Sequence, residues 1–155
     1  MAVLPAGSAV PRFSLRTAEG APFTQDAVIG ERTLMVFYPF AFSPVCTDQL
    51  QLLEEVLEDL AAKQITVVAV SCDASDSQVA FAEKLGVTIR QLSDFEPKGE
   101  TCRAFGVYFA PGGMATRALV LTADDGTLAW TWEGEHPGVM PPLSLVFDAV
   151  EQLGW

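Results

Sequence analysis

The chain has few basic residues. Its 155 residues include nine Lys and Arg against 20 Asp and Glu, which gives a formal net charge of −11. Nucleic acids and anionic membranes bind basic surfaces, so this charge balance argues against both as partners. There is a single histidine, His136, in a loop bounded by glycine and proline. A Cys–His catalytic pair and a histidine metal site are therefore disfavoured, and we expect no metal and no cofactor.

Cysteine is also scarce. The three cysteines stand at positions 46, 72 and 102, without a CxxC pair and without the spacing of a zinc site. Such an odd, widely spaced set is typical of a reducing compartment and leaves at least one thiol free, so we expect a cytoplasmic protein. The missing CxxC argues against a thioredoxin-type disulfide oxidoreductase. Ser43 and Gln49 occupy the positions three residues before and after Cys46.

Long apolar runs are absent as well. No window reaches the roughly 18 uninterrupted apolar residues of a membrane helix. Residues 1–7 lack the basic and apolar segments of a signal peptide. Half of the residues are nevertheless hydrophobic, which predicts a folded globule. The length suits one core, and no repeat or linker divides the chain, so we predict a single domain over residues 1–155.

The hydrophobic pattern predicts alternating strands and helices. We expect an N-terminal hairpin over 9–24, strands over 33–38, 65–71 and 88–93, and a hairpin of strands 118–122 and 127–132. Helices are expected from 44 to about 63, from the cap residues 73–77 to Gly86, and over 101–105 and 143–153. Strand, helix and strand in this order form a right-handed βαβ unit with parallel strands. With the later hairpin and closing helix, the pattern predicts an α/β thioredoxin-like fold, in which helices flank a mixed central sheet preceded by the N-terminal β-hairpin.

The junction between the strand at 33–38 and the next helix carries a helix-start signal. Ser43 is a good N-cap residue, and Pro44 then falls at the first helical position. This numbering places Cys46 in the first turn, where free backbone N–H groups and the helix dipole favour a negative charge. A thiolate is the nucleophilic form of cysteine, so the stretch predicts a reactive thiol at Cys46.

The spacing of Pro39, Ser43 and Cys46 resembles the peroxiredoxin motif Pro-x-x-x-Thr/Ser-x-x-Cys. The likeness continues through residues 37–39, 70–73, 81–87, 92–95 and 104–107, and through Arg117 at the start of an apolar strand. Within that family the chain is most similar to the alkyl hydroperoxide reductase E and bacterioferritin-comigratory groups. The resemblance implies a thiol-specific peroxidase that reduces hydrogen peroxide and organic hydroperoxides, with peroxynitrite as a further candidate oxidant.

The resemblance also assigns roles to four residues. Cys46 would attack one peroxide oxygen and become a sulfenic acid. Ser43 would hydrogen-bond the thiolate and the peroxide, and Pro39 would shape the loop and shield the thiolate from water. Arg117 would hold the thiolate charge and orient the polarised O–O bond.

The chain departs from the family pattern at several positions. Gln49 stands where the family commonly has Glu, and an amide accepts a hydrogen bond from guanidinium without adding charge. Residue 51 and the C-terminal tail, where resolving thiols occur, contain no cysteine. We therefore expect a one-cysteine cycle, in a homodimer, that is resolved by an external thiol or a glutaredoxin- or thioredoxin-like protein. Cys102 remains a candidate internal resolving thiol, and Cys72 is expected to be buried and inert.

One alternative from another functional class stays open. A non-catalytic redox sensor would use the same sulfenic acid at Cys46 and pass the oxidation to a partner protein. Turnover of peroxide with a thiol donor would separate the enzyme from the sensor.

Overall fold

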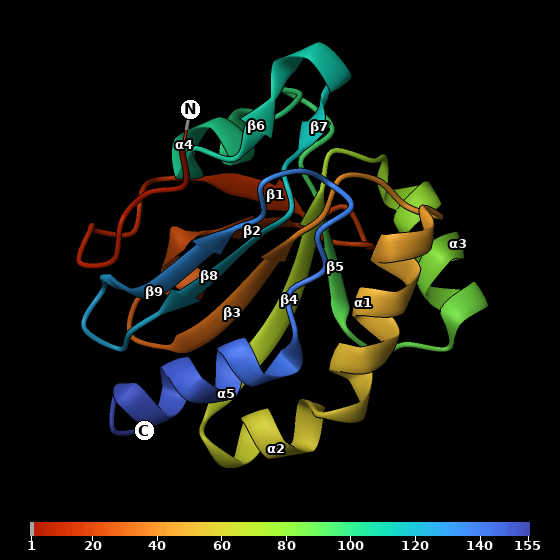
Figure 1. Cartoon of the computed structure of the whole chain (residues 1–155). Coiled ribbons are helices and arrows are strands. Elements are labelled where there is room, and N and C mark those ends of the chain that lie inside the picture. The colour runs from red at the N-terminus through yellow and green to blue at the C-terminus, as the bar shows by residue number, and fades with distance from the viewer. Residues whose placement is uncertain (1) are drawn as a thin grey trace.

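A seven-stranded mixed sheet forms the centre of the computed structural model, which describes residues 2–155 (Figure 1). The strand order is β2-β1-β5-β4-β3-β8-β9. The strands are β1 (Ser14–Arg16), β2 (Pro22–Thr24), β3 (Arg32–Phe37), β4 (Ile65–Ser71), β5 (Arg90–Ser93), β8 (Ala118–Thr122) and β9 (Leu128–Glu133). The helices are α1 (Pro44–Glu55), α2 (Leu57–Ala62), α3 (Ser75–Leu85), α4 (Glu100–Phe105) and α5 (Leu143–Gln152).

The pairing of the strands follows the predicted topology. β3, β4 and β5 are parallel to one another, as the strand–helix–strand order requires. β8 is antiparallel to both β3 and β9, and the N-terminal hairpin of β1 and β2 joins the sheet beside β5. The sequence-based prediction of a mixed central sheet with an N-terminal hairpin is confirmed.

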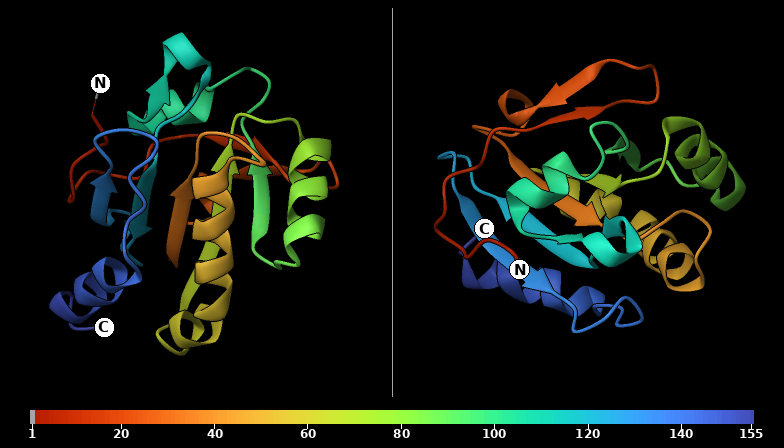
Figure 2. Two further views of the ribbon diagram at one scale, coloured as in Figure 1. Left: turned by 45° about the vertical axis from the view of Figure 1, so that its right-hand side comes forward. Right: turned by 90° about the horizontal axis from the view of Figure 1, so that it is seen from above.

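Both faces of the sheet are buried, and each face carries its own hydrophobic core. Successive side chains of a strand point to opposite faces, so each strand can contribute to both cores. In β3, Leu34 and Val36 enter one hydrophobic core, and Met35 and Phe37 enter another. We call the first the α1-face core, since it also holds apolar residues of α1, α2, α3 and α5. We call the second the α4-face core, because α4 and the N-terminal hairpin cover it. Figures 1 and 2 show α1 and α5 on the same side of the sheet.

The predicted single helix from 44 to about 63 is wrong in one respect, because it is divided into α1 and α2. Val56 lies between them with φ −113° and ψ 11°, outside the helical region. The chain turns there, and α2 runs at an angle to α1 beneath the sheet (Figure 1). This turn keeps Leu60 fully buried in the same core as Ile65, at the start of β4. The free energy gained by burying Leu60 thus outweighs the helix propensity that would continue α1 as one straight helix.

The other boundaries agree with the sequence pattern to within a few residues. β5 begins at Arg90 rather than at 88, and β1 is limited to Ser14–Arg16. A small separate ribbon of β6 (Tyr108–Phe109) and β7 (Met114–Ala115) was not predicted. Strands of two residues are too short to show an alternating pattern. Among residues 2–155, the structure contains no helix long and apolar enough to cross a membrane.

Candidate active site

Cys46 lies in the first turn of α1, directly after the loop that leaves β3. The Ser43 Oγ accepts a hydrogen bond from the Cys46 backbone N–H at 3.3 Å, so Ser43 caps the helix as predicted. Pro44 follows at the first helical position, where its missing N–H costs nothing. The Cys46 side chain belongs to the α1-face core and is 0 % exposed. The position of Cys46 therefore follows from neighbouring residues, namely the Ser43 cap and Pro44.

Arg117 supplies the other half of the site. It precedes β8, the neighbour of β3, and its side chain is only 2 % exposed. The Nη2 group donates to the Cys46 Sγ at 3.1 Å, and Nη1 donates to the Gln49 Oε1 at 2.7 Å. Nε donates to the Pro137 carbonyl oxygen at 2.7 Å. A buried guanidinium needs such partners, and together they fix its orientation toward the sulfur.

Gln49 lies one turn of α1 beyond Cys46 and is 3 % exposed. Its amide oxygen accepts from Arg117, whereas its Nε2 has no hydrogen-bond partner among residues 2–155. The amide therefore positions the guanidinium without neutralising it. The positive charge of Arg117 remains available to the Cys46 sulfur.

The loop before α1 is held by a residue that the sequence indicated only as a helix-cap candidate. The Asp73 Oδ2 accepts from the Ala41 backbone N–H at 2.8 Å and from the Ser71 hydroxyl at 2.7 Å. Phe42, between Ala41 and Ser43, has φ +70°, a backbone conformation that residues other than glycine rarely adopt. Asp73 thus ties the loop to the end of β4 beside this strained residue.

Three of the four predicted site residues, Cys46, Ser43 and Arg117, are joined by hydrogen bonds. Pro39 is buried two residues after β3, but within residues 2–155 no hydrogen bond links it to the other three. It lines a surface pocket of about 410 Å³ that Cys72 also lines. The sequence analysis missed Pro137, because its contribution is a backbone carbonyl that any residue possesses.

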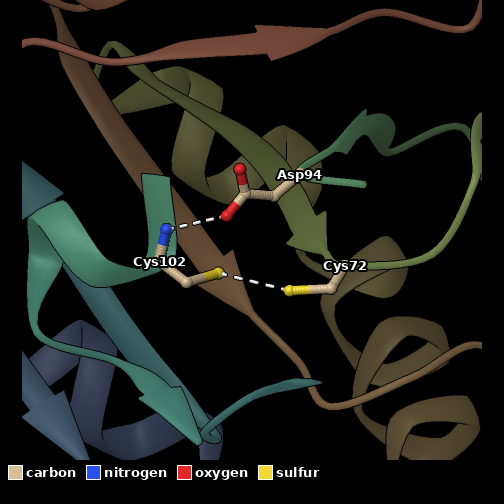
Figure 3. Close-up of side chains that lie close together, drawn as sticks. All are labelled: Cys72, Asp94 and Cys102. Atoms are coloured by element: carbon tan, nitrogen blue, oxygen red, sulfur yellow. Dashed lines mark hydrogen bonds between the residues drawn. The ribbon is translucent and has the colours of Figure 1, made fainter. Parts of the chain in front are cut away.

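Cys72 and Cys102 lie apart from Cys46. Their sulfur atoms are 3.9 Å from each other, and both residues belong to the α4-face core, whereas Cys46 belongs to the α1-face core (Figure 3). Cys46 and this pair therefore belong to the cores on opposite faces of the sheet. Together with Asp94 they form a cluster whose metal-ligating atoms all lie within 4.8 Å of one another.

Comparison with known proteins agrees with this geometry. A profile of the AhpC/TSA family matches residues 6–131. The chain belongs to the AhpC/TSA family. It is a peroxiredoxin, and peroxiredoxins are thiol-dependent peroxidases. Its similar relatives include alkyl hydroperoxide reductase E of Mycobacterium tuberculosis, at 28% identity over 97% of this chain and 99% of the relative. Another is peroxiredoxin Bcp of Escherichia coli, at 33% identity over 68% of this chain and 66% of the relative.

Solved structures of other peroxiredoxins share the fold. Enterococcus faecalis AhpC superposes with a TM-score of 0.86 at 24% identity, covering 99% of this chain and 93% of that one. BcpB of Mycobacterium tuberculosis gives a TM-score of 0.80 at 22% identity, with 97% of both chains covered. The predicted thioredoxin-like fold of this peroxiredoxin is confirmed.

Proposed function

We propose that this peroxiredoxin reduces hydrogen peroxide, organic hydroperoxides and peroxynitrite through Cys46 in a one-cysteine cycle. An external thiol, either small or carried by a glutaredoxin- or thioredoxin-like protein, returns Cys46 to the thiol. The enzyme acts as a homodimer in the cytoplasm. Three free cysteines support a reducing compartment, and the exposed apolar side chains of Leu52 and Met140, which line one surface pocket together, support an association surface.

The contact between the Arg117 Nη2 and the Cys46 Sγ, at 3.1 Å, carries the proposal. A guanidinium at that distance donates a charge-assisted hydrogen bond to the sulfur that attacks the peroxide. The same cation lies where negative charge develops on the peroxide as the O–O bond breaks. Cys46 also lies in the first turn of α1, where the positive end of the helix dipole favours negative charge.

The chemical step transfers one oxygen atom to sulfur. The Cys46 thiolate attacks the terminal peroxide oxygen, an S–O bond forms, and the O–O bond breaks. The leaving alkoxide or hydroxide takes a proton and departs as alcohol or water, which leaves Cys46 as a sulfenic acid. Cys46 has no exposed surface in this state, so a neighbouring side chain or the first turn of α1 must move to admit the peroxide.

The arrangement of the cysteines supports resolution by an external thiol. Cys102, the candidate internal resolving thiol, contacts Cys72 on the opposite face of the sheet from Cys46. A disulfide requires Cα atoms within about 7 Å, so pairing with Cys46 would need a large rearrangement. An external thiol attacks the Cys46 sulfenic acid, releases water and forms a mixed disulfide, which a second thiol then reduces.

Replacement of each cysteine tests the assignment. We expect Cys46→Ser to abolish rapid peroxide consumption, because it removes the only thiol that contacts Arg117 among the described residues. Cys72→Ser and Cys102→Ser should leave the first oxidation step nearly unchanged. Stopped-flow measurement of peroxide decay on the three variants decides the matter. Comparable losses in all three would contradict the role of Cys46.

One equivalent of peroxide tests the one-cysteine cycle. The oxidised parent protein should carry a sulfenic acid that dimedone traps, and intact mass should show no internal disulfide. A digest peptide linking Cys46 to Cys102 would contradict it. Sustained turnover with a thiol donor would exclude the sensor alternative, because a sensor does not consume peroxide catalytically.

A further inference from the structure

Cys72 and Cys102 form a buried pair that the peroxidase mechanism does not use. Cys72 directly follows β4, and Cys102 lies in α4, 30 residues later in the chain. Their Sγ atoms face each other at 3.9 Å (Figure 3). Cys102 is 0 % exposed and Cys72 is 6 % exposed.

A single residue, Asp94, fixes the backbone on both sides of the pair. The Asp94 N–H donates to the carbonyl oxygen of Ser71, the neighbour of Cys72, at 2.8 Å. The Asp94 Oδ2 accepts from the Cys102 N–H at 2.8 Å (Figure 3), and its Oδ1 accepts from the Thr101 N–H at 3.1 Å. The backbone segments that carry the two cysteines are therefore held next to each other. Little conformational freedom is lost when the two sulfur atoms form a bond.

We propose that Cys72 and Cys102 are a second redox site, a dithiol that a small hydroperoxide oxidises to an intramolecular disulfide independently of Cys46. The sulfur atoms need to approach by about 1.9 Å to reach the S–S bond length of ~2.05 Å. Small rotations of the two side chains provide this approach, because the sulfurs already face each other. The pair belongs to the α4-face core and Cys46 to the α1-face core, and the pocket beside Cys72 is also lined by Pro39 of the loop before α1.

The pocket beside Cys72 selects the oxidant. It has a volume of about 410 Å³, and Cys72 lines it together with Lys98 and Asp73. A hydroperoxide is small enough to enter and reach Cys72, a residue that is 6 % exposed. A protein disulfide would need a more accessible sulfur for exchange. Lys98 brings a positive charge to the pocket, where a leaving alkoxide develops negative charge.

Cys72 is the attacking residue, and Cys102 resolves. Cys102 does not line the pocket, and its contact with Cys72, together with burial, raises the pKa of the Cys102 thiol well above its usual range. Cys102 therefore keeps its proton. The Cys72 sulfur attacks the hydroperoxide, an S–O bond forms, the O–O bond breaks, and the alkoxide takes the Cys72 proton and leaves as alcohol. The Cys102 sulfur then attacks the Cys72 sulfur, an S–S bond forms, and the departing hydroxide takes the Cys102 proton to give water.

A metal ion fits the same cluster less well. Cys72, Cys102 and Asp94 offer three ligands, but both carboxylate oxygens of Asp94 already accept backbone N–H bonds. Of these three residues, only Cys72 lines the pocket, whereas Asp94 and Cys102 are buried behind it. Oxidation to a disulfide keeps the Asp94 hydrogen bonds and requires only that the two sulfur atoms approach each other.

The test uses Cys46→Ser, which leaves Cys72 and Cys102 as the only thiols. We expect excess hydrogen peroxide to remove both remaining thiols, to lower the intact mass by two hydrogen atoms, and to yield a digest peptide linking Cys72 to Cys102. Dithiothreitol should restore both thiols. Because Cys46 is absent, failure of this result leaves the proposed peroxidase function untouched.

Two further variants resolve the order of attack. Cys46→Ser/Cys102→Ala should stop at a dimedone-trappable sulfenic acid on Cys72. Its matched control, Cys46→Ser/Cys72→Ala, should keep Cys102 reduced, since Cys102 is not exposed. Circular dichroism confirms that each variant is folded. Persistence of both thiols in folded Cys46→Ser, a sulfinic acid without a linked peptide, or a disulfide between two molecules would each overturn the proposal. Stoichiometric zinc that blocks both thiols would overturn it in favour of a metal site.

Discussion

Arg117 brings a positive charge to the Cys46 sulfur from 71 residues further along the chain. The contact forms because β8, which follows Arg117, pairs with β3, and β3 leads into the loop before α1. The guanidinium is buried and makes hydrogen bonds through Nε, Nη1 and Nη2. Its orientation is thus set before any substrate arrives, which is the condition for efficient electrostatic stabilisation of a transition state.

We expect Arg117→Ala to slow the reaction with peroxide by about two orders of magnitude, as the loss of one preorganised donor does. Stopped-flow measurement of peroxide decay gives the rate. Arg16→Ala, which removes an exposed arginine of β1, serves as the control and should keep the parental rate. An unchanged rate in Arg117→Ala would remove Arg117 from the mechanism.

The residues of the site differ in how far sequence could predict them. Ser43 and Cys46 follow from local rules, since a cap and a first turn involve neighbouring residues only. Arg117 followed from the family resemblance, because no local pattern says which strand lies beside β3. The Pro137 carbonyl and the contact between Cys72 and Cys102 left no signal at all. Both depend on which loops and faces the folded sheet brings together.

At the scale of the elements, two helices end on glycines in the left-handed conformation. Gly86 ends α3 with φ +69°, and Gly106 ends α4 with φ +78°. A side chain added at Gly86 would meet open space, whereas one at Gly106 would meet the backbone carbonyl of Ala2. The N-terminal segment is held there by a hydrogen bond from the Leu4 N–H to the Phe105 carbonyl at 3.0 Å.

This difference predicts unequal effects of one substitution. Gly86→Ala should lower the free energy of unfolding by about 1 kcal/mol, the cost of a left-handed alanine. Gly106→Ala should cost about 3 kcal/mol, because the N-terminal segment must also move away from its bond to α4. Urea denaturation of both variants measures the two losses. Equal losses would show that the segment before β1 does not contribute to the stability of α4.

The N-terminus of α4 depends on a buried carboxyl group. Asp94 is 3 % exposed, and this burial raises its pKa, although the N–H groups of Cys102 and Thr101 act in the opposite direction. The folded protein therefore holds the Asp94 proton to a higher pH than the unfolded chain does. The contribution of this group to stability is greatest at acid pH and falls as pH rises from about 3.8 through the folded-state value.

Asp94→Asn should remove this pH dependence. The difference in unfolding free energy between parent and variant should decrease as pH rises through that window, and then become constant. Urea denaturation over a series of pH values provides the measurement. A difference that grows with pH would mean that the hydrogen bonds to the carboxylate outweigh its burial.

At the scale of the whole molecule, every central strand contributes to both cores. β3, β4 and β8 each direct alternate side chains into the α1-face core and the α4-face core. Neither core can lose its packing without exposing the shared strands. Strands buried on both faces appear in the sequence as continuous apolar runs of strand length, which is why the fold class could be predicted. The division of α1 from α2 could not, since it depends on where α2 meets β4.

The shared strands predict one cooperative unfolding transition, the behaviour expected if residues 2–155 fold as a single domain. All three tryptophans, Trp130, Trp132 and Trp155, pack against the α1-face core, so their fluorescence reports on that face. Far-ultraviolet circular dichroism reports on the whole sheet and all helices. The two signals should give the same midpoint in urea under reducing conditions. Separate midpoints would indicate that the two faces unfold independently.

The amide of Gln49 has a consequence for electroneutrality around Cys46. Arg117 and a Cys46 thiolate cancel one another, and the amide adds no charge. Once oxidation converts the thiolate to an uncharged sulfenic acid, the guanidinium is left without a counterion in a site that water does not reach. A carboxylate at position 49 would have supplied that counterion. With the amide in its place, the oxidised site attracts anions, and in the one-cysteine cycle proposed above the incoming reductant is such an anion, a thiolate.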